Sequence, residues 1–224
     1  MKKIVLAFSI VALLLFFVYL FLPNKSDAPE VNPNTVCRRH MSHIHGFMVD
    51  YHKKNGVPLT SVVQDGDRLL SWRYVMAKEM ITSSPYSSSW YHWDAVEPWN
   101  DTYNMEEIAF FSFCCYVETN TSKQRKVSDT SYLMLLHSEE NVSDLPARAV
   151  IVVESADCGI HWMEPKDISI ETLRKADSPF GQGLLNSYHD DYVNVLCKNG
   201  NIVRISKKYS KDKVIAILEG KGKR

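Results

Sequence analysis

The sequence lacks an excess of charge of either sign, because 26 Lys and Arg residues are balanced by 26 Asp and Glu residues. Long-range attraction to nucleic acid is therefore not indicated, and we predict no nucleic-acid partner. The sequence also lacks a Gly-x-Ser-x-Gly nucleophile elbow, a Ser-x-x-Lys set with its partner motifs, a phosphate loop and a dinucleotide fingerprint. Without a catalytic motif, we predict a protein that is not an enzyme and has no cofactor.

Cysteine is scarce, and its spacing excludes a zinc ribbon, because no pair of Cys-x-x-Cys motifs occurs. In an oxidising compartment the cysteines could form disulfides, and the alternative is that all of them are reduced and buried. Because their number is odd, at least one cysteine is either a free thiol or paired with another chain. The five are Cys37, Cys114, Cys115, Cys158 and Cys197.

Charge is absent from residues 4–22, a run that follows Lys2 and Lys3 and ends at Pro23. About 20 apolar residues are enough to cross the hydrocarbon core of a bilayer. The run therefore predicts a single-pass transmembrane helix in the cell membrane, with the N-terminus cytoplasmic and the bulk of the chain extracytoplasmic. The alternative is a signal peptide that is cleaved.

The remaining sequence is long enough for one domain with its own core. We predict a transmembrane anchor over residues 1–23, a polar stalk over 24–35, a folded domain over 36–207 and a solvated basic extension over 208–224. Apolar residues at helical spacing predict a first helix that is capped by Thr35 and ends at Asn55-Gly56. Further helices are expected at residues 69–81, 105–113 and 167–175.

Most strands are expected in the second half of the chain. Alternating or buried-type runs predict strands at residues 132–136, 150–153, 192–198 and 201–206, with a possible edge strand at 214–218. Asn199-Gly200 predicts a two-residue type I′ turn between the third and fourth of these strands. Helices that precede hairpin-connected strands indicate an α+β fold with an antiparallel sheet.

Several motifs together resemble a known family. His189 is followed by nine residues and then by Asn199-Gly200. The other motifs are the helix CRRHMSHIHGFMVDYHKKNG that opens at Cys37, and the segments Ser71-Trp72-Arg73, Glu97-Pro98-Trp99-Asn100 and 152–165. Over about residues 37–206 the chain resembles the planctomycete pseudopilin-like family of unknown function, which ends in His, nine residues and Asp-Gly. It differs from that family in having Asn199 in place of Asp and no pilin-type processing site.

This resemblance implies a transmembrane helix followed by a pilin-like domain of helices packed on an antiparallel sheet. By family position, it also implies a disulfide between Cys37 and either Cys114 or Cys115. The resemblance names no molecular activity, and it implies self-assembly or interaction with other proteins at the cell envelope.

The best candidate for a metal or acid–base site follows the strand at 150–153 and comprises Glu154, Asp157, His161 and Glu164. The favoured alternative is a loop whose polar groups satisfy its own backbone. An aromatic loop at residues 87–104 could stack on a sugar or a peptide, or form its own small core. Histidines in the first helix, namely His40, His43, His45 and His52, are interpreted as a solvated helix face.

We therefore predict a membrane-anchored, extracytoplasmic, pseudopilin-like protein with an interaction or assembly role at the cell envelope. The alternative function is an envelope ligand-binding protein or metal-dependent enzyme that uses the Glu154–Glu164 cluster and the aromatic loop.

Overall fold

The computed structural model of the protein describes residues 32–82, 100, 129–138 and 142–222, and every structural statement below concerns these residues. From Pro33 onward they belong to one compact unit. Its elements in chain order are α2 (Pro33–Asn55), β1 (Val62–Asp65), β2 (Arg68–Ser71), α3 (Trp72–Thr82), β3 (Tyr132–Leu136), β4 (Val150–Glu154), β5 (Ile168–Ser169), α6 (Ile170–Lys175), β6 (Tyr192–Cys197), β7 (Ile202–Ser206) and α7 (Lys211–Leu218).

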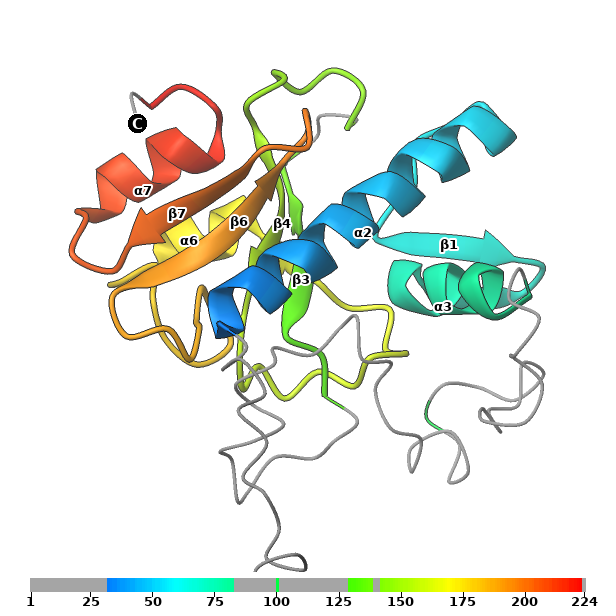
Figure 1. The fold of residues 1–224 in the computed structure, drawn as a ribbon, viewed down its shortest axis with the longest axis horizontal. Coiled ribbons are helices and arrows are strands. Elements are labelled where there is room, and N and C mark those ends of the chain that lie inside the picture. The colour runs from blue at the N-terminus through cyan, green and yellow to red at the C-terminus, as the bar shows by residue number, and fades with distance from the viewer. Residues whose placement is uncertain (1–31, 83–99, 101–128, 139–141, 223–224) are drawn as a thin grey trace, which may run out of the picture. The chain divides into compact units, whose positions relative to one another are not determined.

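The main sheet has five strands in the order β5-β3-β4-β6-β7 (Figure 1). The pairs β3–β4, β4–β6 and β6–β7 are antiparallel, whereas β3 and β5 are parallel. The fold is thus α+β with a mixed sheet, and the prediction of an antiparallel sheet is wrong at this edge. The parallel pair arises because the chain leaves β4 through a long loop and returns as β5, which lies beside β3 and runs in the same direction as β3.

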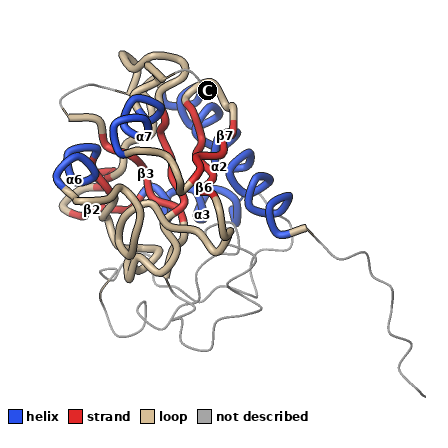
Figure 2. The backbone as a smooth tube through the Cα atoms, turned by 90° about the vertical axis from the view of Figure 1, so that its left-hand side faces the viewer, coloured by secondary structure: helices blue, strands red, loops and turns tan. Residues whose placement is uncertain are grey.

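Helices cover both faces of this sheet. On one face, Met41 and Ile44 of α2 pack with Met134 of β3, Val152 of β4 and Leu196 of β6. Figure 2 shows α2 on one side of the strands and α6 and α7 on the other. Because successive residues of a strand point to opposite faces, β3, β4, β6 and β7 each supply apolar side chains to both layers.

The second apolar layer lies under α6 and α7. Leu173 of α6 and Leu218 of α7 pack with Leu133, Val153 and Val195 from three neighbouring strands. Residues of the predicted basic extension thus belong to the core. The edge strand predicted at residues 214–218 is wrong, because Ser210 caps a helix there by accepting a hydrogen bond from the Lys213 backbone N–H.

Helix α2 ends where the sequence predicts. The backbone N–H of Gly56 donates to the carbonyl of His52 at 2.8 Å, with Gly56 at φ +73°. A left-handed residue in this position satisfies a terminal carbonyl that the helix cannot pair itself. The helix begins earlier than predicted, at Pro33, so Thr35 lies inside it and is not its N-cap.

A small hairpin precedes α3, and the sequence pattern did not predict it. Strands β1 and β2 pair with Asp65 opposite Arg68, so Gly66 and Asp67 form a two-residue turn with Gly66 at φ +61°. The helix predicted at 69–81 therefore begins only at Trp72, since residues 69–71 belong to β2.

A fully buried ion pair connects α3 to the main sheet. The Arg73 guanidinium donates to the Asp167 carboxylate at 2.7 Å, and both side chains have no exposed surface. Arg73 also donates to the carbonyls of Trp162, Glu164 and Lys166 at 2.9, 2.8 and 2.9 Å. The Asp167 carboxylate in turn accepts hydrogen bonds from the Ser61 hydroxyl, the Trp72 indole and the Met134 backbone N–H. Nearly every donor of the buried guanidinium is thus paired.

The β6–β7 hairpin is present, but its turn differs from the predicted one. The Gly200 N–H donates to the Cys197 carbonyl at 2.9 Å, and the Cys197 N–H donates to the Asn201 carbonyl at 2.9 Å. The loop therefore contains three residues, and only Gly200, at φ +82°, is left-handed. The N–H groups of Lys198 and Asn199 donate to carbonyls in the segment before β4, and these tertiary bonds favour the longer loop.

The predicted transmembrane helix requires correction. Among the residues that the structure describes, no helix combines the length and apolar character needed to cross a membrane. The run at residues 4–22, together with the rest of the predicted anchor and most of the predicted stalk, lies outside the described residues. The membrane localisation predicted from that run therefore has no support here.

Candidate functional site

Three chemically active side chains meet where α2 crosses the sheet. Cys37 comes from the first turns of α2, Glu154 from the last position of β4, and His189 from the segment that leads into β6. One thiol, one carboxylate oxygen and one ring nitrogen lie within 4.8 Å of one another, and all three residues are buried. Elements far apart in the sequence thus place a thiol, a carboxyl group and an imidazole in one buried site.

Hydrogen bonds from Asn194 on the neighbouring strand fix the Glu154 carboxylate. The Asn194 backbone N–H donates to Oε2 at 2.8 Å, and its side-chain amide donates to Oε1 at 3.0 Å. Both residues are buried, so this pairing offsets part of the cost of removing the carboxylate from water. It also orients the carboxylate relative to Cys37 and His189.

The ring of His189 is fixed by its neighbours. It stacks on Tyr192 with the ring centroids 4.8 Å apart and an interplanar angle of 13°. The backbone carbonyl of His189 accepts a hydrogen bond from Lys207 at 2.7 Å, which anchors the segment before β6. The ring nitrogen Nε2 lies 3.8 Å from Glu154 Oε1, and within the described chain no hydrogen bond of good geometry reaches it.

Burial changes the proton affinity of this site. It raises the pKa of Glu154 from 4.5 to about 7, the charge of Cys37 adds to this rise, and the hydrogen bonds from Asn194 oppose it. For His189, burial alone would lower the pKa, but the close approach of the Cys37 side chain and the charge of Glu154 outweigh burial and raise it. Around neutral pH the buried carboxyl group and the imidazole therefore both tend to hold protons.

This arrangement has two chemical capabilities. A thiolate, an imidazole and a carboxylate are ligands for a borderline divalent cation. A cysteine beside a histidine can also act as a nucleophile. Reactive cysteines, however, lie in partly exposed surroundings, whereas Cys37 is fully buried. Burial therefore favours ion binding over nucleophilic catalysis.

The structure separates the four residues that the sequence grouped. Asp157 accepts a hydrogen bond from the Tyr188 hydroxyl, and Nδ1 of His161 accepts one from the Met163 N–H at 3.2 Å. Glu164 lies 3.9 Å from the ammonium of Lys166. In the part of the chain that the structure describes, the one three-residue group suited to a metal contains Glu154 but none of the other three.

The His189, Asn199 and Gly200 motif connects the β6–β7 hairpin to α2. His189 approaches Cys37, and the turn at Gly200 lies against His45, whose Nε2 is 3.2 Å from the Lys198 carbonyl oxygen. The Asn199 side chain accepts a hydrogen bond from the Asn201 N–H at 3.1 Å and stabilises the turn. The two ends of the motif thus contact α2 at two points.

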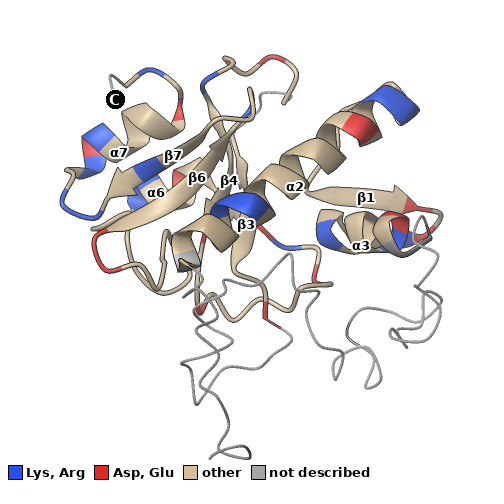
Figure 3. Ribbon diagram, viewed as in Figure 1, with Lys and Arg blue, Asp and Glu red and all other residues tan. Residues whose placement is uncertain are grey.

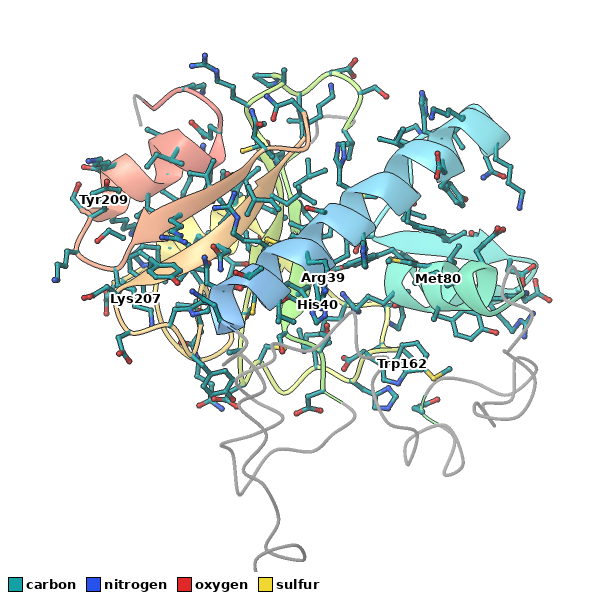
Figure 4. The ribbon with its side chains drawn as sticks, viewed as in Figure 1. Arg39, His40, Met80, Trp162, Lys207 and Tyr209 are labelled. Carbon is teal, nitrogen blue, oxygen red and sulfur yellow. The ribbon has the colours of Figure 1, made fainter. Side chains whose placement is uncertain are left out.

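The histidines of α2 do not form one solvated face. His43 and His52 are exposed, but His45 is half-buried at the hairpin turn and His40 is buried. Figure 4 shows His40 on α2 near β3, where its ring meets Tyr132 edge-on at 6.3 Å. The prediction of a solvated face is therefore wrong for two of the four.

The predicted disulfide is also corrected. No two cysteines are joined by a disulfide among residues 32–82, 129–138 and 142–222. Cys114 and Cys115 lie outside the described residues, as do the helix expected at 105–113 and nearly all of the aromatic loop at 87–104. Cys37 is found beside Glu154 and His189 instead.

Sequence reasoning missed Cys37 as a site residue. The available signal is the spacing of Cys37, Met41 and Ile44 at steps of four and three, which puts the thiol on the apolar face of the first helix. The sequence does not show which strand of the sheet this face of the helix contacts.

No family model, curated protein or solved structure matches the chain.

Proposed function

We propose that the chain is a non-enzymatic interaction protein whose copies associate head to tail. Self-assembly is one of the two roles that its resemblance to the pseudopilin-like family implies. The observation that carries this proposal is an apolar groove of about 300 Å³ beside the second half of α2. Its apolar lining consists of Met48, Val49, Pro58, Leu59, Val142 and Ile151. An apolar groove of this size accommodates a large aliphatic side chain from another molecule.

Basic groups surround the groove, and the surface next to it is apolar. His52, Lys53 and Lys198 contribute to the rim, while Val49 and Val57 are 36% and 56% exposed. Exposed apolar surface with a polar rim is typical of interaction sites. The expected occupant is therefore an apolar side chain accompanied by carboxylates.

The β1–β2 hairpin of the same chain has this chemistry. Leu69 is 56% exposed, and Asp65 and Asp67 lie at the adjacent turn. Figure 3 shows acidic residues at this hairpin and basic residues at the C-terminal end of α2. Because the hairpin and the groove are different surfaces, pairing them between copies gives a heterologous contact, which builds a ring or an open chain of molecules.

Self-association of the purified full chain, measured by sedimentation velocity over a range of concentrations, tests this function. We expect Leu69→Ser to weaken association by at least roughly tenfold, because the transferred apolar surface of a leucine contributes about 1.5–3 kcal/mol. Leu136, another exposed leucine, supplies the matched control Leu136→Ser, which should have no effect.

Exchanging charges between the groove and the β1–β2 hairpin tests whether these two surfaces meet. Lys53→Glu and Asp67→Lys should each weaken association, and the double variant should restore part of it. A chain that remains monomeric at all concentrations, or that associates equally well with Leu69→Ser, contradicts the proposal.

The alternative function, a ligand-binding protein or metal-dependent enzyme that uses residues 154–164 and the aromatic loop, stays a prediction. The separate contacts of Asp157, His161 and Glu164 do not favour it.

A further inference from the structure

We infer that Cys37, Glu154 and His189 bind one Zn²⁺ ion between α2 and the main sheet. Their three ligand atoms belong to three elements and face one another in the interior of the domain. A cation at this point would connect the first helix directly to β4 and to the segment before β6. The inference is independent of self-association, because the groove beside α2 is lined by other residues.

The ligand set identifies the class of metal. Thiolate, imidazole and carboxylate are the three groups that bind Zn²⁺ in proteins, whereas Mg²⁺ and Ca²⁺ prefer sites made of oxygen atoms. The presence of a thiol and an imidazole therefore excludes a dedicated calcium or magnesium site. Three protein ligands leave a fourth tetrahedral position for water or another group.

The distances suit a compact tetrahedral site. Zinc bonds of about 2.0–2.3 Å place neighbouring ligand atoms roughly 3.5 Å apart. His189 Nε2 and Glu154 Oε1 are already 3.8 Å apart, and no pair in the cluster exceeds 4.8 Å. Closing the site around an ion therefore needs side-chain movements of about 1 Å or less, which rotations of the Cys37 and Glu154 side chains can supply.

The second independent observation is the ring nitrogen of His189. The side chain is only 7% exposed, and Nε2 has no hydrogen-bond partner of good geometry among the described residues. Buried ring nitrogens are normally hydrogen-bonded, so one that points at a carboxylate and a thiol without such a bond requires an explanation. Coordination of a cation by Nε2 would be that explanation.

Outer contacts hold the ligands in position. Asn194 donates to both carboxylate oxygens of Glu154, and Tyr192 stacks on the His189 ring. Metal sites commonly orient their carboxylate and imidazole ligands through such neighbours. The carboxylate oxygens keep further lone pairs for a metal while bonded to Asn194.

Cobalt binding by the reduced, metal-free full chain tests the inference. Co²⁺ reports on zinc sites because a cysteine ligand gives a thiolate-to-cobalt charge-transfer absorption in the near ultraviolet. We expect this band to saturate at one Co²⁺ per chain and to disappear when Zn²⁺ displaces the cobalt. X-ray absorption of the zinc-loaded chain should show one sulfur ligand with the remaining ligands nitrogen or oxygen.

Variants assign the ligands. Cys37→Ser should abolish the band, and His189→Gln and Glu154→Gln should weaken Co²⁺ binding by at least about tenfold. The controls Cys158→Ser and His161→Gln remove a thiol and an imidazole outside the cluster and should leave binding unchanged.

The wild-type measurements decide the question even if a variant does not fold. Absence of stoichiometric Co²⁺ binding to the reduced wild-type chain overturns the inference. It is also overturned by a zinc site without sulfur, or by a charge-transfer band that survives Cys37→Ser.

Discussion

At the scale of single residues, the stability of the fold is sensitive to substitution of Arg73 or Asp167. Their ion pair is completely buried and is surrounded by hydrogen bonds. Removing one charge leaves the other in the interior without its partner, which typically costs about 3–5 kcal/mol. We expect Asp167→Ala to lower the free energy of unfolding by about this amount in urea denaturation.

The exposed pair of Lys54 and Glu79 is the matched control. Their ion pair has the same N–O distance as the buried one, 2.7 Å, but the side chains are 64% and 43% exposed. Glu79→Ala should therefore lower the free energy of unfolding by less than about 1 kcal/mol. Equal losses in the two variants would show that burial does not increase the cost of breaking the Arg73–Asp167 pair.

Glu154 makes the stability of the metal-free protein depend on pH. Burial raises its pKa to about 7 from 4.5, so the folded chain keeps a proton that the unfolded chain releases across this interval. The free energy of unfolding should therefore fall as the pH rises from about 4.5 to 7. The raised pKa of His189 acts in the same direction, because its stabilisation is lost as the pH rises through the folded-state pKa.

Chemical denaturation in the presence of a chelator, at several pH values, measures this slope. Cys37 and Arg204 also act on the site electrostatically, so the sharper comparison is Glu154→Gln, which removes the carboxyl titration and, with it, the charge that raises the pKa of His189. The variant should have the shallower slope between pH 4.5 and 7. A Glu154→Gln variant with the same slope as the wild type would rule out the raised pKa.

At the scale of elements, the β6–β7 hairpin depends on the absence of a side chain at its turn. A Cβ on Gly200 would lie 2.8 Å from the His45 ring, and φ is +82°. Gly200→Ala should therefore lower the free energy of unfolding by more than the roughly 1 kcal/mol expected for a left-handed backbone alone. Gly66 has φ +61° and open space around it, so Gly66→Ala measures the backbone contribution by itself.

Thermal or urea denaturation of both glycine variants gives the comparison. Combining Gly200→Ala with His45→Ala should recover the part of the loss that comes from the ring contact. If Gly200→Ala and Gly66→Ala cost the same, the turn does not pack on α2.

Local signals predicted the two strands of this hairpin and the C-terminal end of α2. The alternation in residues 192–197 and the glycine at 200 act within a few residues, so the sequence contains them. The exact turn depended on carbonyls of Ala147 and Ala149, which are distant in sequence. For the same reason the parallel β3–β5 pair was missed, since two residues of β5 have no pattern of their own.

The candidate site was predicted only in part, for a related reason. Glu154 and His189 were each singled out, but in different motifs, and Cys37 was assigned to a disulfide. Their convergence depends on how α2 lies across β4 and β6, which no local spacing specifies. The acidic loop at 154–164 looked like a site because its polar residues are close in sequence, although each makes its own contact.

At the scale of the whole molecule, the sheet is stabilised by apolar layers on both faces, and the last helix completes one of them. Val214 and Leu218 of α7 are fully buried against strands that come much earlier in the chain. The C-terminal residues are therefore part of the folding unit, in contrast to the solvated extension expected from their basic composition.

Shortening the chain tests this view of the C-terminus. Deleting residues 208–224 should abolish cooperative unfolding, because the face of the sheet under α7 would be exposed to water. The milder Leu218→Ala should lower the free energy of unfolding by about 2–5 kcal/mol, the usual cost of a cavity at a buried leucine. Ile215→Ala, at a half-buried position of the same helix, should cost less. Differential scanning calorimetry distinguishes these results, and a truncated chain that melts like the full one would show that α7 contributes nothing to the core.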